Sequence, residues 1–105
     1  MGKKERIEQI VSSLREYDPE RIILFGSHAR RDPDEYSDLD LVVIKETEER
    51  FLDRLKRVYE LVRPTFAMDL LVYTPEEFAR MKEEGNPLIE RVCEEGVVVY
   101  EKARP

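Results

Sequence analysis

The chain reads Arg21-Ile22-Ile23-Leu24-Phe25-Gly26-Ser27 and, further on, Ser37-Asp38-Leu39-Asp40-Leu41-Val42-Val43-Ile44. The apolar run over residues 21–25 stops at a glycine and is typical of a buried strand. The second run predicts another strand over residues 38–44, although it contains two aspartates. A polar stretch rich in arginine and aspartate connects the two strands.

Helix and strand patterns alternate along the rest of the chain. The segment Thr74-Pro75-Glu76-Glu77 is a capping box with proline at the first helical position. This order favours an α/β (α+β) fold in which helices cover a sheet of about four strands. The further predicted elements are a helix over Lys3–Tyr17, a helix over Phe51–Val62 with Thr47 as candidate cap, a strand over Phe66–Tyr73, helices from Thr74 to about Glu84 and from Asn86 to near Gly96, and a strand over Val97–Tyr100.

Length and composition limit the class of protein. With 105 residues the chain predicts one domain over residues 1–105. The 24 acidic residues outnumber the 18 basic ones, which disfavours binding to nucleic acid through its phosphates. No apolar run approaches the ~20 residues of a membrane span, so we expect a soluble, cytoplasmic protein. The scarcity of Asn and Gln beside abundant Glu, Lys and Arg resembles proteins of thermophiles.

Three aspartates lie in or at the start of apolar strand runs, where an unpaired carboxylate is costly. Asp38 and Asp40 point to the same side of their strand, about 7 Å apart at ~3.3 Å rise per residue. Asp69 can join them if the third strand pairs with the second. Three converging carboxylates favour Mg²⁺. The alternative is structural: Asp38 caps a loop, Asp40 lies at a sheet rim and Asp69 pairs with an arginine.

Gly26 and Ser27 follow the first strand directly. Glycine permits a tight turn and a close approach of the backbone to a ligand. If residues 28–31 begin a short helix, its amides and the Ser27 hydroxyl point at a bound anion. On its own, a Gly-Ser pair after a strand is more often a plain turn.

Taken together, Gly26-Ser27-His28-Ala29-Arg30-Arg31 and Ser37-Asp38-Leu39-Asp40-Leu41-Val42-Val43 resemble the nucleotidyltransferase superfamily that includes DNA polymerase beta. The chain looks most like the minimal nucleotidyltransferases, whose pattern is G-S-x-A-R-G, a spacer and S-D-x-D-L-x-V, with a later aspartate in an apolar strand. The resemblance covers the whole chain and implies a small mixed β-sheet. Arg31 stands where the family has a second glycine.

The resemblance implies a role for each motif residue. Asp38 and Asp40 would hold two Mg²⁺ ions that bridge the triphosphate of ATP or another nucleoside triphosphate. Gly26 and Ser27 would hold the outer phosphates. Asp69 would help to bind the second metal ion or take the proton from the acceptor hydroxyl.

Two more residues of the motifs are candidates for nucleotide binding. Arg30 contacts phosphate or a strand-end carboxylate in one interpretation and braces the loop in the other. Ser37 caps or braces the loop that leads into Asp38.

Minimal nucleotidyltransferases are often encoded beside all-helical HEPN proteins, which are toxins, and act as their antitoxins. The resemblance therefore implies transfer of AMP from ATP to a tyrosine hydroxyl of such a partner. The net charge of −6 fits a basic protein partner. Two alternatives stay open: a non-catalytic antitoxin that neutralises its partner by contact, and a nucleotidyltransferase acting on a small molecule or RNA.

Overall fold

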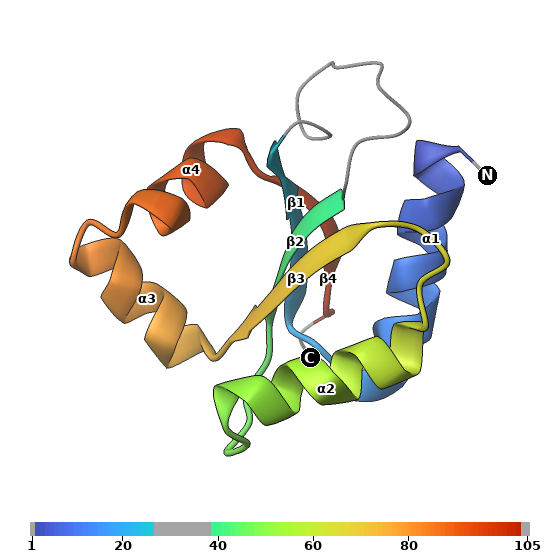
Figure 1. The fold of residues 1–105 in the computed structure, drawn as a ribbon. Coiled ribbons are helices and arrows are strands. Elements are labelled where there is room, and N and C mark those ends of the chain that lie inside the picture. Colours follow the sequence, from blue (N-terminus) through green and yellow to red (C-terminus); the bar gives the residue numbers. More distant parts are fainter. Residues whose placement is uncertain (1, 27–38, 104–105) are drawn as a thin grey trace.

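The structure is a computed structural model that describes residues 2–26 and 39–103. Helices cover a central sheet, as the sequence predicts, and they lie on both of its faces (Figure 1). None of the helices in these residues has the length and apolar character of a membrane span. The elements are α1 (Lys3–Leu14), a 3₁₀ turn η1 (Arg15–Tyr17), β1 (Arg21–Phe25), β2 (Leu39–Ile44), α2 (Phe51–Val62), β3 (Met68–Tyr73), α3 (Pro75–Glu83), α4 (Pro87–Glu95) and β4 (Val97–Glu101).

The described residues form a four-stranded mixed sheet in the order β3-β2-β1-β4. β1 is antiparallel to both β2 and β4, whereas β2 and β3 are parallel. A parallel pair needs a crossover connection, and α2 supplies it. This order places β4 at one edge of the sheet and β3 at the other.

The alternation of side chains along β2 builds a core on each face. Leu39, Leu41 and Val43 belong to the larger core, which lies under α1 and α2. Val42 and Ile44 belong to a smaller core on the opposite face, which α3 and α4 cover. Because both faces are buried, the strand is an almost continuous apolar run, as is usual for such sheets.

The capping box of α3 is the one that the sequence predicts, and α4 begins after Asn86, where the sequence places its start. The Thr74 hydroxyl accepts from the Glu77 backbone N–H at 3.1 Å, and the Glu77 carboxylate accepts from the Thr74 N–H at 2.8 Å. Asn86 caps α4 by accepting from the backbone N–H groups of Leu88 and Ile89. These short-range bonds satisfy donors at the helix starts that would otherwise be orphaned.

The prediction that Thr47 caps α2 is wrong. The helix begins at Phe51, and its N-cap is Arg50, whose side chain makes no capping bond. The Thr47 hydroxyl accepts instead from the backbone N–H of Glu49 at 3.1 Å. Threonine therefore closes a local turn ahead of the helix, an alternative that its short side chain always offers.

A buried guanidinium joins α2, β3 and α3. Arg54 is only 6% exposed. Its Nε donates to the carbonyl of Glu49 at 2.8 Å, and Nη1 donates to the carbonyl of Val72 at 3.3 Å. Nη1 and Nη2 also meet the two carboxylate oxygens of Glu77 at 2.6 and 3.3 Å. The Glu77 carboxylate therefore takes part in both the helix cap and a bidentate ion pair. The hydrogen bonds from Arg54 hold the pKa of Glu77 below the ordinary value of 4.5.

Replacing Glu77 by glutamine is expected to lower the free energy of unfolding by about 2 kcal/mol at pH 7, because Arg54 loses a charged acceptor. The pKa of Glu77 is depressed by folding, so its contribution is complete above pH 4.5 and disappears as the pH falls through the folded-state pKa. Urea unfolding of the wild type and the variant at pH 7 and near pH 3 measures the loss of unfolding free energy at each pH. Glu76→Gln, an exposed residue of the same turn, is the matched control; an equal loss for Glu77→Gln at both pH values would contradict the ion pair.

Candidate active site

Asp40 and Asp69 lie side by side on neighbouring strands. The parallel register of β2 and β3 pairs these two residues directly, which confirms that the third strand of the sequence pairs with the second. Paired residues point to the same face of a sheet, and their strands lie about 4.8 Å apart. This is the face that α3 and α4 cover, yet Asp69 is exposed and Asp40 only partly buried. The two carboxylates therefore lie together at the end of the sheet where β2 and β3 begin.

Gly26 brings backbone against this pair. The last residue of β1, Phe25, pairs with Asp40, so the chain leaves β1 beside the carboxylate. Gly26 has φ 79°, in the left-handed region that favours glycine. A Cβ at this position would overlap Oδ2 of Asp40 and lie 3.2 Å from its Cγ. The position thus needs glycine for its conformation and for the closeness of the carboxylate.

The described residues contain Gly26, Asp40 and Asp69 of the predicted site. In these residues no group of three or more His, Cys, Asp or Glu side chains is placed to hold a metal ion. The two aspartates are thus the part of the predicted trio that the structure places. The other predicted site residues lie outside the described ranges: Ser27, Arg30, Ser37 and Asp38.

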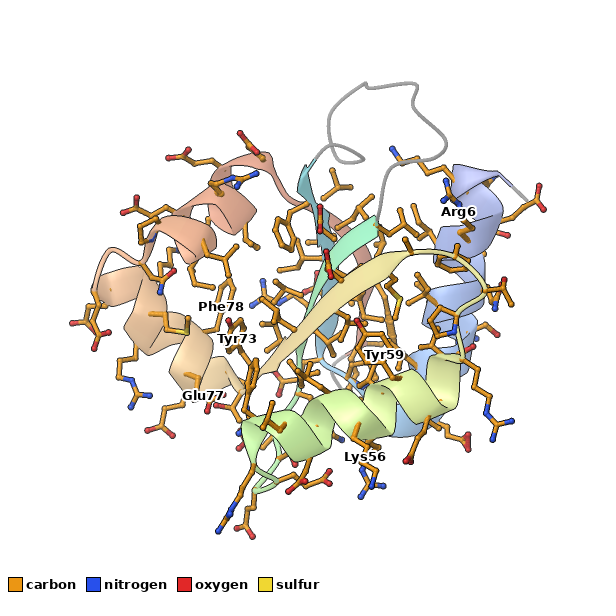
Figure 2. All side chains as sticks on the ribbon, viewed as in Figure 1. Arg6, Lys56, Tyr59, Tyr73, Glu77 and Phe78 are labelled. Carbon is orange, nitrogen blue, oxygen red and sulfur yellow. The ribbon has the colours of Figure 1, made fainter. Side chains whose placement is uncertain are left out.

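A tyrosine that the sequence analysis does not single out fixes the backbone next to Asp69. The Tyr59 hydroxyl, on α2, donates to the carbonyl of Met68 at 2.9 Å. Figure 2 shows Tyr59 reaching from α2 toward β3. Burial raises the pKa of Tyr59, and the charge of Asp69 raises it further. The signal in the sequence is a phenol on the apolar side of a helix, which needs a polar partner once buried.

Comparison with known proteins assigns the family. The family model for the polymerase beta nucleotidyltransferase domain matches residues 8–105, and the chain belongs to this family. Its fold and its motifs accordingly make it a nucleotidyltransferase, as the sequence motifs imply. The search of curated proteins gave no match.

Solved structures share the fold. A protein from Sulfolobus solfataricus assigned as a nucleotidyltransferase is 26% identical, with a TM-score of 0.59 over 94% of this chain and 77% of the other. A toxin–antitoxin with AMP-PNP is 19% identical, with a TM-score of 0.61 over 91% and 73%. A variant of the toxin–antitoxin MntA-HpeT is 17% identical, with a TM-score of 0.60 over the same shares.

Gly26→Ala is expected to lower the free energy of unfolding by roughly 1–2 kcal/mol, the cost of a left-handed residue with a Cβ, and to displace the Asp40 carboxylate. Calorimetric titration with ATP and Mg²⁺ should then show weaker binding. Gly85→Ala is the matched control, since Gly85 also has a positive φ (73°) but its nearest neighbour would be Oε1 of Glu90 at 3.5 Å. If Gly26→Ala bound ATP with Mg²⁺ as tightly as the wild-type protein, the close approach to Asp40 would be unimportant for binding.

Proposed function

We propose that this nucleotidyltransferase transfers AMP from ATP to a hydroxyl group of a partner protein and is the antitoxin of a toxin–antitoxin pair. The observation that carries the proposal is the direct pairing of Asp40 with Asp69 beside Gly26. Two carboxylates on directly paired strand residues repel each other, and a cation bound between them would offset that repulsion. A stability cost at the open end of a sheet is typical of a functional site.

The residues at this rim fit Mg²⁺. Carboxylate oxygens are the ligands that Mg²⁺ takes from proteins, together with water and phosphate oxygens. Asp40 and Asp69 supply such oxygens from adjacent strands, and the missing side chain of Gly26 lets the backbone lie against the Asp40 carboxylate. Asp38 would be the third ligand, and two ions would be held in all. When bound, Mg²⁺ would supply positive charge that offsets the triphosphate and the charge of the leaving group.

The chain's own residues orient the reactants. Gly26 and Ser27 would donate to the outer phosphates, and Arg30 and Ser37 would contact phosphate or support that loop. The acceptor oxygen would attack the α-phosphorus in line with the bond to the β-phosphate, which breaks and releases pyrophosphate. Asp69, exposed at the rim, would take the proton of the acceptor hydroxyl.

The antitoxin assignment rests on the similar structures and on charge. One of them is a toxin–antitoxin with AMP-PNP, an analogue of ATP. Another is a variant in which two aspartates two positions apart are changed to glutamate, the spacing of Asp38 and Asp40. A third is a variant with a tyrosine changed to alanine. A basic, all-helical toxin of the HEPN type, with tyrosine as acceptor, is the partner that the net charge of −6 complements.

Mixing the chain with the product of its neighbouring gene, Mg²⁺ and each nucleoside triphosphate tests this function. Mass spectrometry should show one AMP added to the neighbour with ATP, and Asp40→Ala should reduce the rate at least 100-fold while circular dichroism stays unchanged. Asp53→Ala, an exposed acid on α2, is the control and should keep the wild-type rate. A tight complex without added mass would identify a non-catalytic antitoxin; no complex at all would point to a small-molecule or RNA acceptor.

Asp69→Asn is expected to raise the metal-free thermal midpoint, because it removes one of two like charges that face each other across β2 and β3. Removing a cross-strand repulsion of about 0.5 kcal/mol corresponds to roughly 2–4 °C for a domain of this size. Adding Mg²⁺ with ATP should stabilise the wild type more than Asp69→Asn, since a ligand stabilises the state that binds it. Equal stabilisation of both proteins, measured by calorimetry, would remove Asp69 from the metal site.

A further inference from the structure

A pocket of about 440 Å³ lies between the sheet and the α3–α4 layer. It is on the face that carries Asp40, but it opens toward the edge strand β4 and lies at the far end of β1 from Gly26. Figure 2 shows Phe78 of α3 in the space between that helix and the sheet. The residues of the lining that matter here are Ile23, Phe78, Val92 and Val98, which are apolar, and Arg21 and Lys82, which are basic.

The pocket exists because α3 packs loosely. This helix contains no buried residue, whereas α4 beside it buries Ile89 and Val92 in the sheet. Phe78 packs against the smaller core and lines the pocket, and the exposed Ala79 lines it as well. An apolar helix side that borders open space is available to a further apolar group.

The edge strand β4 adjoins the pocket. Val97 and Val98 are each 47% exposed, and Val98 also lines the pocket. Residues 97–100 carry no charge that would discourage pairing at this edge. An exposed strand edge next to a side-chain pocket is the arrangement with which proteins bind extended peptides: backbone bonds give affinity and the pocket selects the side chain.

The charges of the pocket specify the occupant. Among the described residues that line it, Arg21 and Lys82 are the charged ones, and both are basic in a chain of net charge −6. Neither side chain makes an ion pair or hydrogen bond within residues 2–26 and 39–103. Glu101 pairs with Arg21 in the strand register, yet no ion pair joins these two side chains. The pocket therefore complements an apolar group that is accompanied by a carboxylate.

We propose that β4 and this pocket bind an extended segment of a partner protein, which adds to the sheet beside β4 and places an apolar and an acidic side chain in the pocket. Side chains two positions apart share a strand face, so the segment carries the two at that spacing. Ile23 lines the pocket from β1, and Phe25 of the same strand pairs with Asp40. These two residues of β1 lie about 7 Å apart along the strand, which separates the pocket from the carboxylates. The bound segment leaves the carboxylates open, and its binding does not require nucleotide transfer.

Selection of random twelve-residue peptides displayed on phage tests the proposal, with wild-type chain as bait and Val98→Asp for counter-selection. The expected peptides have an acidic residue two positions from an aromatic or aliphatic one. By fluorescence anisotropy, the double reversal Arg21→Glu with Lys82→Glu should weaken a selected peptide at least tenfold, and replacing the peptide's acid by lysine should restore binding to that variant. Lys56→Glu, an exposed lysine of α2 on the other face, is the charge-matched control and should change nothing.

The single cysteine gives an independent readout. Cys93 lines the pocket and its thiol is exposed, so a bound peptide should slow its alkylation. Asp40→Ala should keep full peptide affinity, which separates this proposal from the proposed activity. Selected peptides that bind the charge-reversed variant equally well, or leave the alkylation rate unchanged, would overturn it. So would a dimer in sedimentation that Val98→Asp dissociates, because a second copy would then occupy β4.

Discussion

The parallel pairing of β2 with β3 is the constraint on which the candidate active site depends. A slip of one residue would send the Asp69 side chain to the opposite face of the sheet from Asp40. Two side chains of α2 fix the backbone of β3 near its two ends. Tyr59 donates to the carbonyl of Met68 at the start of the strand, and Arg54 donates to the carbonyl of Val72 near its end. Because β3 is an edge strand, the crossover helix thus provides polar partners that a neighbouring strand would otherwise supply.

The carboxylate pair and the pocket divide one face of the sheet between them. The carboxylates lie where β1 ends and β2 and β3 begin, and the pocket lies toward the opposite end, beside β4. In the two proposals, the carboxylates carry out the transfer, and β4 with the pocket holds the partner protein. A partner held at the edge strand would present its hydroxyl group to the rim from outside. The acceptor specificity would then reside in the partner's shape as much as in this chain.

Most of the fold is predictable because its signals are local. The apolar runs of β1 and β2, the capping box at Thr74 and the Asn86 cap each depend on a few adjacent residues, and each appears where expected. The wrong cap at Thr47 is also instructive. The Thr47 hydroxyl can accept either from an N–H group of the helix or from the nearby Glu49 N–H, and the sequence alone does not decide between these donors.

The features that the sequence does not predict depend on distant partners. Arg54 looks like a solvated charge until Glu77 and Val72 meet it, and β4 becomes an edge strand only through the sheet order. For the site, the strand patterns allow Asp69 to join Asp40 only if the two strands pair, and the structure pairs these two residues, whereas the part assigned to Asp38 remains a prediction.

The position of the Arg54–Glu77 ion pair has a consequence for how this chain can change. It joins α2 and α3 where β3 ends, whereas Asp69 lies where β3 begins. The ion pair and the candidate active site therefore lie at opposite ends of one six-residue strand. In the proposed function, substitutions at the carboxylate rim that change the acceptor would leave the Arg54–Glu77 ion pair, and with it the junction of α2 and α3, intact.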